Sequence, residues 1–120
     1  MSGFIKAENF DGKRQFIEKF DGLNFLQSLM TDEVASTSVK LYKKVLICAC
    51  DLIVNDDTIF KEQPFMVRDF FARSEQIYGM LIKAVSHERA QIEDVKMFDV
   101  RLWTLRILFR LHQHKAEEIG

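Results

Sequence analysis

The sequence predicts an all-α protein whose 120 residues form one domain, residues 1–120. Apolar residues recur every three or four positions along most of the chain, which is the spacing of one face of an α-helix, and no stretch alternates as a half-buried strand does. Only five glycines and one proline interrupt this pattern. With 48% hydrophobic residues, the chain has enough apolar material for one core but not for a second domain.

Two short helices are expected at residues 13–20 and 23–31, folded back on each other. Each has an apolar stripe with helical spacing: Phe16, Ile17 and Phe20 on the first, and Leu23, Leu26, Leu29 and Met30 on the second. The expected turn is at Gly22, because glycine adopts a positive φ without the strain that a side chain brings. Asp11 is the expected N-cap of the first helix.

A longer third helix is expected at residues 37–54, where the hydroxyl groups of Ser36, Thr37 and Ser38 offer N-caps. Its apolar stripe consists of Tyr42, Val45, Leu46, Ala49, Leu52 and Ile53. The polar stretches on either side of it, residues 31–38 and 55–58, are expected to be loops.

The second half of the chain predicts three more helices, at residues 64–72, 74–86 and 91–115, with a polar hinge at residues 87–90. Pro64 suits the first turn of a helix, where its missing N–H has no partner to lose, and Ser74 suits the N-cap of the next. The main stripe of the last helix consists of Ile92, Val95, Phe98, Leu102, Leu105, Phe109 and His112. Because Trp103, Ile107 and Leu108 widen this stripe, the last helix is expected to pack on both sides.

Two short helices and a longer third one in about 40 residues form the unit of an armadillo-type solenoid. The run F-I-x-x-F-D-G-L-x-F-L-x-S-L at residues 16–29, followed by V-K-x-x-x-K-V-L-x-x-x-x-D-L-I at residues 39–53, resembles the armadillo-type nucleotide exchange factors of DnaK-type chaperones. The endoplasmic-reticulum branch is the most similar, with a glycine pair before the first leucine of the second helix. Here Asp21 replaces the first of those glycines. The resemblance covers residues 13–60, less than half of the chain.

This resemblance implies an armadillo-like α-solenoid of two to three repeats, as a fragment of a longer solenoid. It implies binding to the ATPase domain of a DnaK-type chaperone and promotion of ADP release, in the endoplasmic reticulum lumen or, alternatively, in the cytoplasm. The alternative function is a generic armadillo scaffold that binds an extended peptide or protein partner. Such a scaffold would carry asparagines at matching positions of successive third helices, and only Asn55 fits that pattern.

The candidate partner-binding surface is the side of the third helix opposite its apolar stripe. It carries Lys40, Lys44, Ile47, Asp51 and Asn55, spaced to lie along one line of the helix. Third helices line the concave groove of a solenoid, and such grooves bind partners. The alternative is an ordinary solvated helix face.

No catalytic, metal or cofactor site is expected. The three histidines lack the spacing of a metal site and are expected at the surface or half-buried: His87, His112 and His114. Cys48 and Cys50 lie about 200° apart around a helix, so they cannot form a disulfide with each other and are expected to be small buried hydrophobes. The remaining acid candidates are at helix ends, where capping explains them: Asp11, Asp21, Asp56 and Asp57.

Charge and hydropathy narrow the choice of partner further. With 17 Lys and Arg against 18 Asp and Glu, the net charge of −1 gives no electrostatic reason to bind nucleic acid or an anionic membrane. No apolar run approaches the roughly 18 residues of a membrane span. The chain is therefore expected to bind protein, with no small-molecule substrate and no enzymatic activity.

Overall fold

The computed structural model describes residues 9–84 and 95–119, and every regular element in these two ranges is a helix. The helices are α1 Phe10–Glu18, α2 Gly22–Leu29, α3 Asp32–Thr37, α4 Val39–Val54, α5 Asp56–Ile59, α6 Met66–Arg73, α7 Glu75–Ala84 and α9 Val95–Ile119. The all-α class is therefore confirmed. The expected hinge at residues 87–90, His87 and Ile92 lie outside the described residues.

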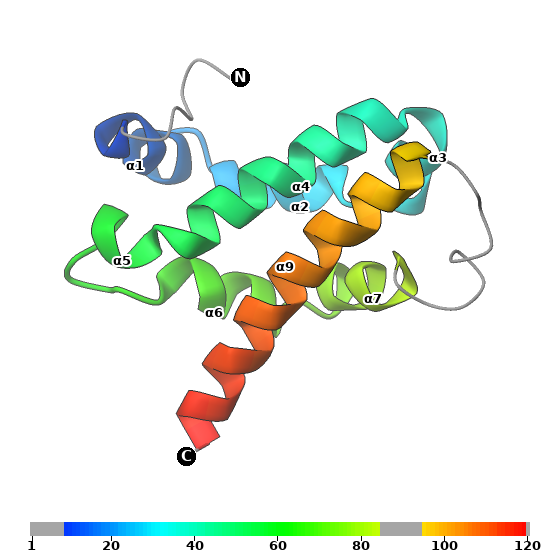
Figure 1. Ribbon diagram of the computed structural model, residues 1–120. Coiled ribbons are helices and arrows are strands. Elements are labelled where there is room, and N and C mark those ends of the chain that lie inside the picture. Colours follow the sequence, from blue (N-terminus) through cyan, green and yellow to red (C-terminus); the bar gives the residue numbers. More distant parts are fainter. Residues whose placement is uncertain (1–8, 85–94, 120) are drawn as a thin grey trace.

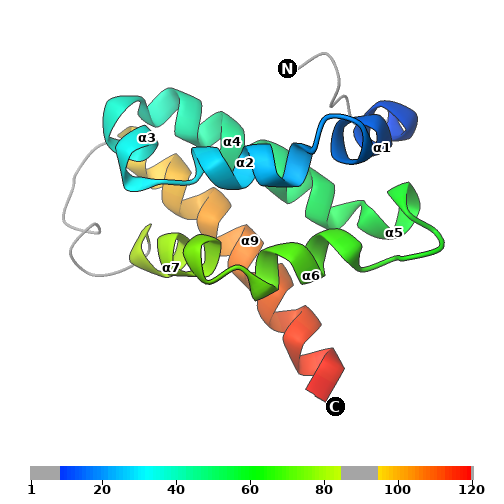
Figure 2. The same cartoon turned by 180° about the vertical axis from the view of Figure 1, so that it is seen from behind.

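The helices form two layers. The long helices α4 and α9 lie side by side on one face, and the shorter helices α1, α2, α6 and α7 lie behind them (Figures 1 and 2). The molecule measures 43 × 38 × 21 Å along its principal axes. Its shortest dimension equals about two helix diameters, as expected for two layers.

The same order of helix lengths occurs twice along the chain. The short pair α1 and α2 precedes the long α4, and the short pair α6 and α7 precedes the long α9. Within each set the helices pack on one another, and α9 packs most extensively on α4. The core lies between the two layers, and all six residues of the expected α4 stripe are buried in it.

The turn between α1 and α2 differs from the expectation. Asp21, with φ 51° and ψ 45°, is the left-handed residue, and Gly22 is the first residue of α2. Gly22 is required for a different reason: a Cβ there would overlap the ring of Phe16 and lie 2.6 Å from its carbonyl oxygen. The expected burial of Phe20 is also wrong, because this residue follows the end of α1 and is 60% exposed.

The N-cap expected for α1 is wrong, because Asn9 and not Asp11 caps this helix, which begins three residues earlier than expected. Asn9 is the N-cap, its Oδ1 accepting from the N–H of Gly12 at 2.9 Å, and Asp11 lies in the first turn. Pro64 precedes α6, which begins at Met66, instead of lying in its first turn.

Two stretches that were expected to be loops contain short helices. Thr31 caps α3 by accepting from the N–H of Val34 at 3.3 Å, and Ala35 turns into the core, so a polar stretch becomes helical. The segment after α4 contains the short helix α5. The caps expected at Ser38 and Ser74 are confirmed by bonds of 3.2 Å from the N–H groups of Leu41 and Ile77.

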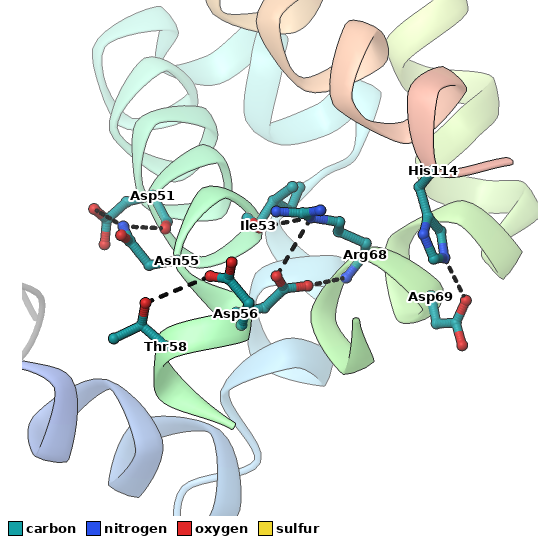
Figure 3. A network of polar contacts seen from close by, with 9 residues as sticks. Asp51, Ile53, Asn55, Asp56, Thr58, Arg68, Asp69 and His114 are labelled. Atoms are coloured by element: carbon teal, nitrogen blue, oxygen red, sulfur yellow. Dashed lines mark hydrogen bonds and ion pairs between the residues drawn. The ribbon is translucent and has the colours of Figure 1, made fainter. Parts of the chain in front are cut away.

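Asp56 joins α5 to α6 through a buried polar contact, shown in Figure 3. Its Oδ2 accepts from the N–H of Arg68 at 3.1 Å, and its Oδ1 lies 3.3 Å from the Arg68 guanidinium, which also donates to the carbonyl of Ile53. Asp56 therefore caps a helix, as expected, but the helix is α6 and not its own. Burial raises the pKa of Asp56 to about 6, against the opposing hydrogen bond and charge of Arg68.

This carboxyl group makes stability depend on pH. Its pKa is about 6 in the folded protein and 3.8 ordinarily, so between these values the folded state binds more protons than the unfolded state. Stability from Asp56 is present below about pH 4 and is lost as pH rises through 6. We expect Asp56→Asn, which keeps an acceptor for the Arg68 N–H, to gain several degrees in Tm relative to wild type between pH 4 and pH 7. Thermal melts across this range test it, and a constant difference in Tm would contradict it.

Candidate partner-binding groove

The described part of α9 exposes one apolar side and buries another. Leu105 and Phe109 are 53% and 66% exposed, and Leu102 is 37% exposed. The buried side consists of Val100, Thr104, Ile107, Leu108, Leu111 and His114. The expectation that Leu102, Leu105 and Phe109 belong to a core-facing stripe is wrong. Packing on both sides of α9 is not observed in the described residues.

Two polar residues explain why the buried side of α9 is difficult to identify from the sequence. Thr104 satisfies its hydroxyl by donating to the carbonyl of Val100 at 2.7 Å. His114 is only 4% exposed, with Nε2 2.7 Å from a carboxylate oxygen of Asp69 on α6, so the expectation that it is at the surface or half-buried is wrong. Both residues interrupt the apolar pattern on the side of α9 that packs. In the sequence, the exposed side therefore has the more regular apolar spacing.

The exposed apolar side borders a groove of about 1000 Å³ between α4 and α9. The α4 wall consists of Ile47, Cys50, Asp51, Val54 and Asn55. The α9 wall consists of Leu102, Trp103, Leu105, Arg106, Leu108, Phe109, Arg110 and His112. The two helices lie close at their N-terminal ends, where Lys43 Nζ is 3.0 Å from Asp99, and diverge toward their C-terminal ends (Figure 1). The groove therefore follows from the angle between the two long helices.

Three of the five expected site residues line this groove. Ile47, Asp51 and Asn55 belong to its α4 wall. Lys40 and Lys44 are exposed on α4 but do not line the groove. The α9 wall was missed as a site, although its unusual number of apolar positions was the available signal.

The polar groups of Asp51 and Asn55 on the α4 wall make contacts within the fold. Asp51 Oδ2 is 2.7 Å from Nζ of Lys13, whose side chain is completely buried. The side-chain amide of Asn55 donates to the carbonyl and the carboxylate of Asp51, at 2.9 and 3.1 Å (Figure 3). The negative charge of Asp51 is therefore already matched by a cation of the same chain.

The groove has a positive edge on α9. Arg106 lies over the ring of Trp103, 4.6 Å from its centroid, and Arg110 follows one turn later. Both side chains are exposed, and neither is in an ion pair with a carboxylate in residues 9–84 or 95–119. Both charges act on Cys50 of the α4 wall, opposing the burial that raises the pKa of this thiol.

The two cysteines are buried thiols, and Cys50 lines the groove. Cys48 and Cys50 are both buried and free, as expected from their positions on the helix. Burial raises the pKa of Cys48 to about 12 and also raises the pKa of Cys50, so both are protonated thiols at neutral pH. A thiol is a much weaker nucleophile and metal ligand than a thiolate.

Contacts with the short helices hold α9 in place as a groove wall. The ring of His112 lies against Tyr78 of α7, whose hydroxyl is 2.9 Å from Nε2, and Lys115 Nζ lies over the ring of the same tyrosine, 4.0 Å from its centroid. His114 packs against Phe65, with ring centroids 5.4 Å apart. These contacts hold the C-terminal half of α9 against α6 and α7.

The described residues contain no cluster of three or more His, Cys, Asp or Glu side chains that could hold a metal ion. None of the helices described here combines the length and apolar character that a membrane crossing requires. Comparisons of the chain with protein-family models, with curated proteins and with solved structures gave no match.

Proposed function

We propose that this chain is a protein-binding module of armadillo-like architecture and that its partner binds in the groove between α4 and α9. The observation that carries the proposal is the exposed apolar side of α9 along an open groove of about 1000 Å³. Contiguous exposed apolar surface of this kind marks interaction sites on folded proteins. The repeated order of two short helices and one long helix supports the solenoid architecture.

The more specific proposal is a nucleotide exchange factor fragment that binds the ATPase domain of a DnaK-type chaperone. Its support is the sequence resemblance around the first turn, together with the geometry of that turn. Asp21 stands where the family has its first glycine and is the left-handed residue, and Gly22 stands at the second and contacts Phe16 closely. A glycine pair would satisfy these two separate requirements. On the basis of this resemblance we also propose the endoplasmic reticulum lumen as its location, with the cytoplasm as the alternative.

Exchange by such a module requires no catalytic residue. A partner bound more tightly in its open than in its closed form is shifted toward the open form, and ADP then escapes. The groove suits this role because its polar groups are held in internal contacts or carry fixed positive charge. The peptide-scaffold alternative is less favoured, because the amide of Asn55 already donates to Asp51 instead of being available to a peptide backbone.

Release of a fluorescent ADP analogue from a DnaK-type ATPase domain, measured by stopped flow, tests this function. We expect the protein to accelerate release and Phe109→Asp to reduce the acceleration about tenfold or more, because the substitution removes the most exposed apolar anchor and adds a charge to the groove. The double variant Lys40→Glu/Lys44→Glu is expected to weaken it less, since these lysines lie beside the groove.

Gln113→Ala, on an exposed position of α9 that does not line the groove, is the matched control and is expected to behave as wild type. Absence of acceleration with any DnaK-type ATPase domain would overturn the exchange-factor proposal. If the Phe109→Asp variant still melts cooperatively and accelerates ADP release as wild type does, the groove is not the binding surface.

A further inference from the structure

We propose that the occupant of the α4–α9 groove is an amphipathic helix of another protein, with acidic side chains beside its apolar face. The inference rests on the proposed role of the groove as a partner site and adds the chemistry of the partner. It is carried by the shape of the groove, the spacing of its exposed anchors and the sign of its charges.

The anchors on α9 have the spacing that a partner helix requires. Leu102, Leu105 and Phe109 follow one another at i, i+3 and i+7, so they form a line about 10 Å long on one side of α9. Val54 extends the apolar surface on the α4 wall. A helix that lies in a groove contributes anchors at the same intervals from its own side. Two to three turns of a partner helix therefore match the apolar length of the groove.

An extended peptide fits this surface less well. A peptide that binds by strand addition needs the free N–H and C=O groups of a strand edge, and the described residues contain only helices. A helix satisfies its own backbone hydrogen bonds and needs only side-chain contacts. The groove between α4 and α9 offers such contacts from both walls.

The charges of the groove select acidic flanks. Arg106 and Arg110 lie one turn apart on the α9 wall without a carboxylate partner in the described ranges, while Asp51 on the α4 wall is matched by Lys13. Lys44, which does not line the groove, is exposed on α4 about two turns before Asp51. Carboxylates beside the apolar face of a partner would form charge-assisted hydrogen bonds with the two guanidinium groups. Basic flanks would place like charges together and bind more weakly.

A second copy of this chain does not match these requirements. Among the described helices, only α9 presents three exposed large apolar side chains on one side. Pairing two copies through α9 would bring Arg106 and Arg110 of both copies near one another, which is unfavourable.

Two synthetic peptides test the inference by fluorescence anisotropy. Both are alanine-rich helices of about 18 residues, long enough to be partly helical alone, with leucines at i, i+3 and i+7. One carries glutamates beside the leucines and the other carries lysines. We expect the glutamate peptide to bind the wild-type protein about tenfold or more tightly at low salt, and the preference to shrink as salt screens the charges.

Charge reversal in the groove makes the test specific. Arg106→Glu/Arg110→Glu is expected to reverse the preference, so that the lysine peptide binds more tightly. The matched control, Lys19→Glu/Lys61→Glu, changes the net charge equally at exposed positions outside this groove and is expected to keep the wild-type preference. Equal binding of both peptides, binding of neither, or reversal in the control would overturn the inference. A dimer in analytical ultracentrifugation that Phe109→Asp dissociates would also overturn it, because a second copy would then occupy the groove.

The outcomes for this inference and for the exchange function are distinguishable. Preference for the glutamate peptide without acceleration of ADP release would retain the acidic-helix inference and overturn the exchange-factor proposal. Acceleration that depends on Phe109, with no discrimination between the peptides, would retain the exchange function and overturn the inference.

Discussion

Gly22→Val is expected to lower the free energy of unfolding by about 3 kcal/mol or more, because there is no room for a side chain between Gly22 and Phe16. The first atom of any side chain there overlaps the Phe16 ring and lies 2.6 Å from the Phe16 carbonyl oxygen. The ring can move only by leaving the core and its edge contact with Phe25, at 6.4 Å between centroids, and the carbonyl belongs to α1. The two helices would have to separate. Chemical denaturation followed by circular dichroism measures this change.

Gly79→Ala is the matched control, since Gly79 is also a helical glycine but has room for a side chain. Gly79 lies inside α7, and a Cβ would meet nothing within 4 Å. Alanine is expected to stabilise the protein by up to about 1 kcal/mol through its higher helix propensity. If Gly22→Val were as stable as Gly79→Ala, the close approach of α1 and α2 at Gly22 would be wrong.

Asp51→Ala is expected to cost about 2–3 kcal/mol, because it removes the carboxylate that lies 2.7 Å from the buried ammonium group of Lys13. The Lys13 side chain is completely buried, whereas that of Asp51 is 27% exposed. Lys13→Met should therefore cost less, about 1 kcal/mol, since the Asp51 side chain is partly exposed and its Oδ1 keeps the bond from Asn55, although its Oδ2 is buried. Denaturant unfolding of both single variants gives the two values.

The double variant Lys13→Met/Asp51→Ala completes the cycle and should be more stable than Asp51→Ala alone, because it removes the buried ammonium group together with its carboxylate. A larger cost for Lys13→Met than for Asp51→Ala would contradict the account of this pair. The cycle also matters for the groove, because it separates the structural role of Asp51 from any contact with a partner.

The helices that pack through regular apolar stripes could be predicted from the sequence. All six expected stripe residues of α4 are buried, and the caps at Ser38 and Ser74 form as expected. The short helices α3 and α5 could not be predicted, because they consist of polar residues and depend on caps and on contacts with the rest of the fold. The turn was placed correctly, but its conformation depends on the distance between α1 and α2, which no local pattern reveals.

The candidate site was predicted only in part, for a similar reason. Helical spacing brought Ile47, Asp51 and Asn55 to one side of α4, and the structure places them in the groove. The α9 wall could not be assigned, because the side of α9 that packs contains Thr104 and His114, whose polar groups find partners within the fold. Regular apolar spacing identified the helix, but partners of the polar residues decided which side is buried.

The most direct test of the central claim is the effect of a DnaK-type ATPase domain on the methyl NMR spectrum of this protein. The account predicts shifts or broadening for Ile47, Val54, Leu102 and Leu105, which line both walls of the groove. The signals of Ile82, exposed on α7 outside the groove, should stay unchanged. Changes confined to other surfaces, or an unchanged spectrum at saturating concentrations of the ATPase domain, would contradict the groove as the site where this partner binds.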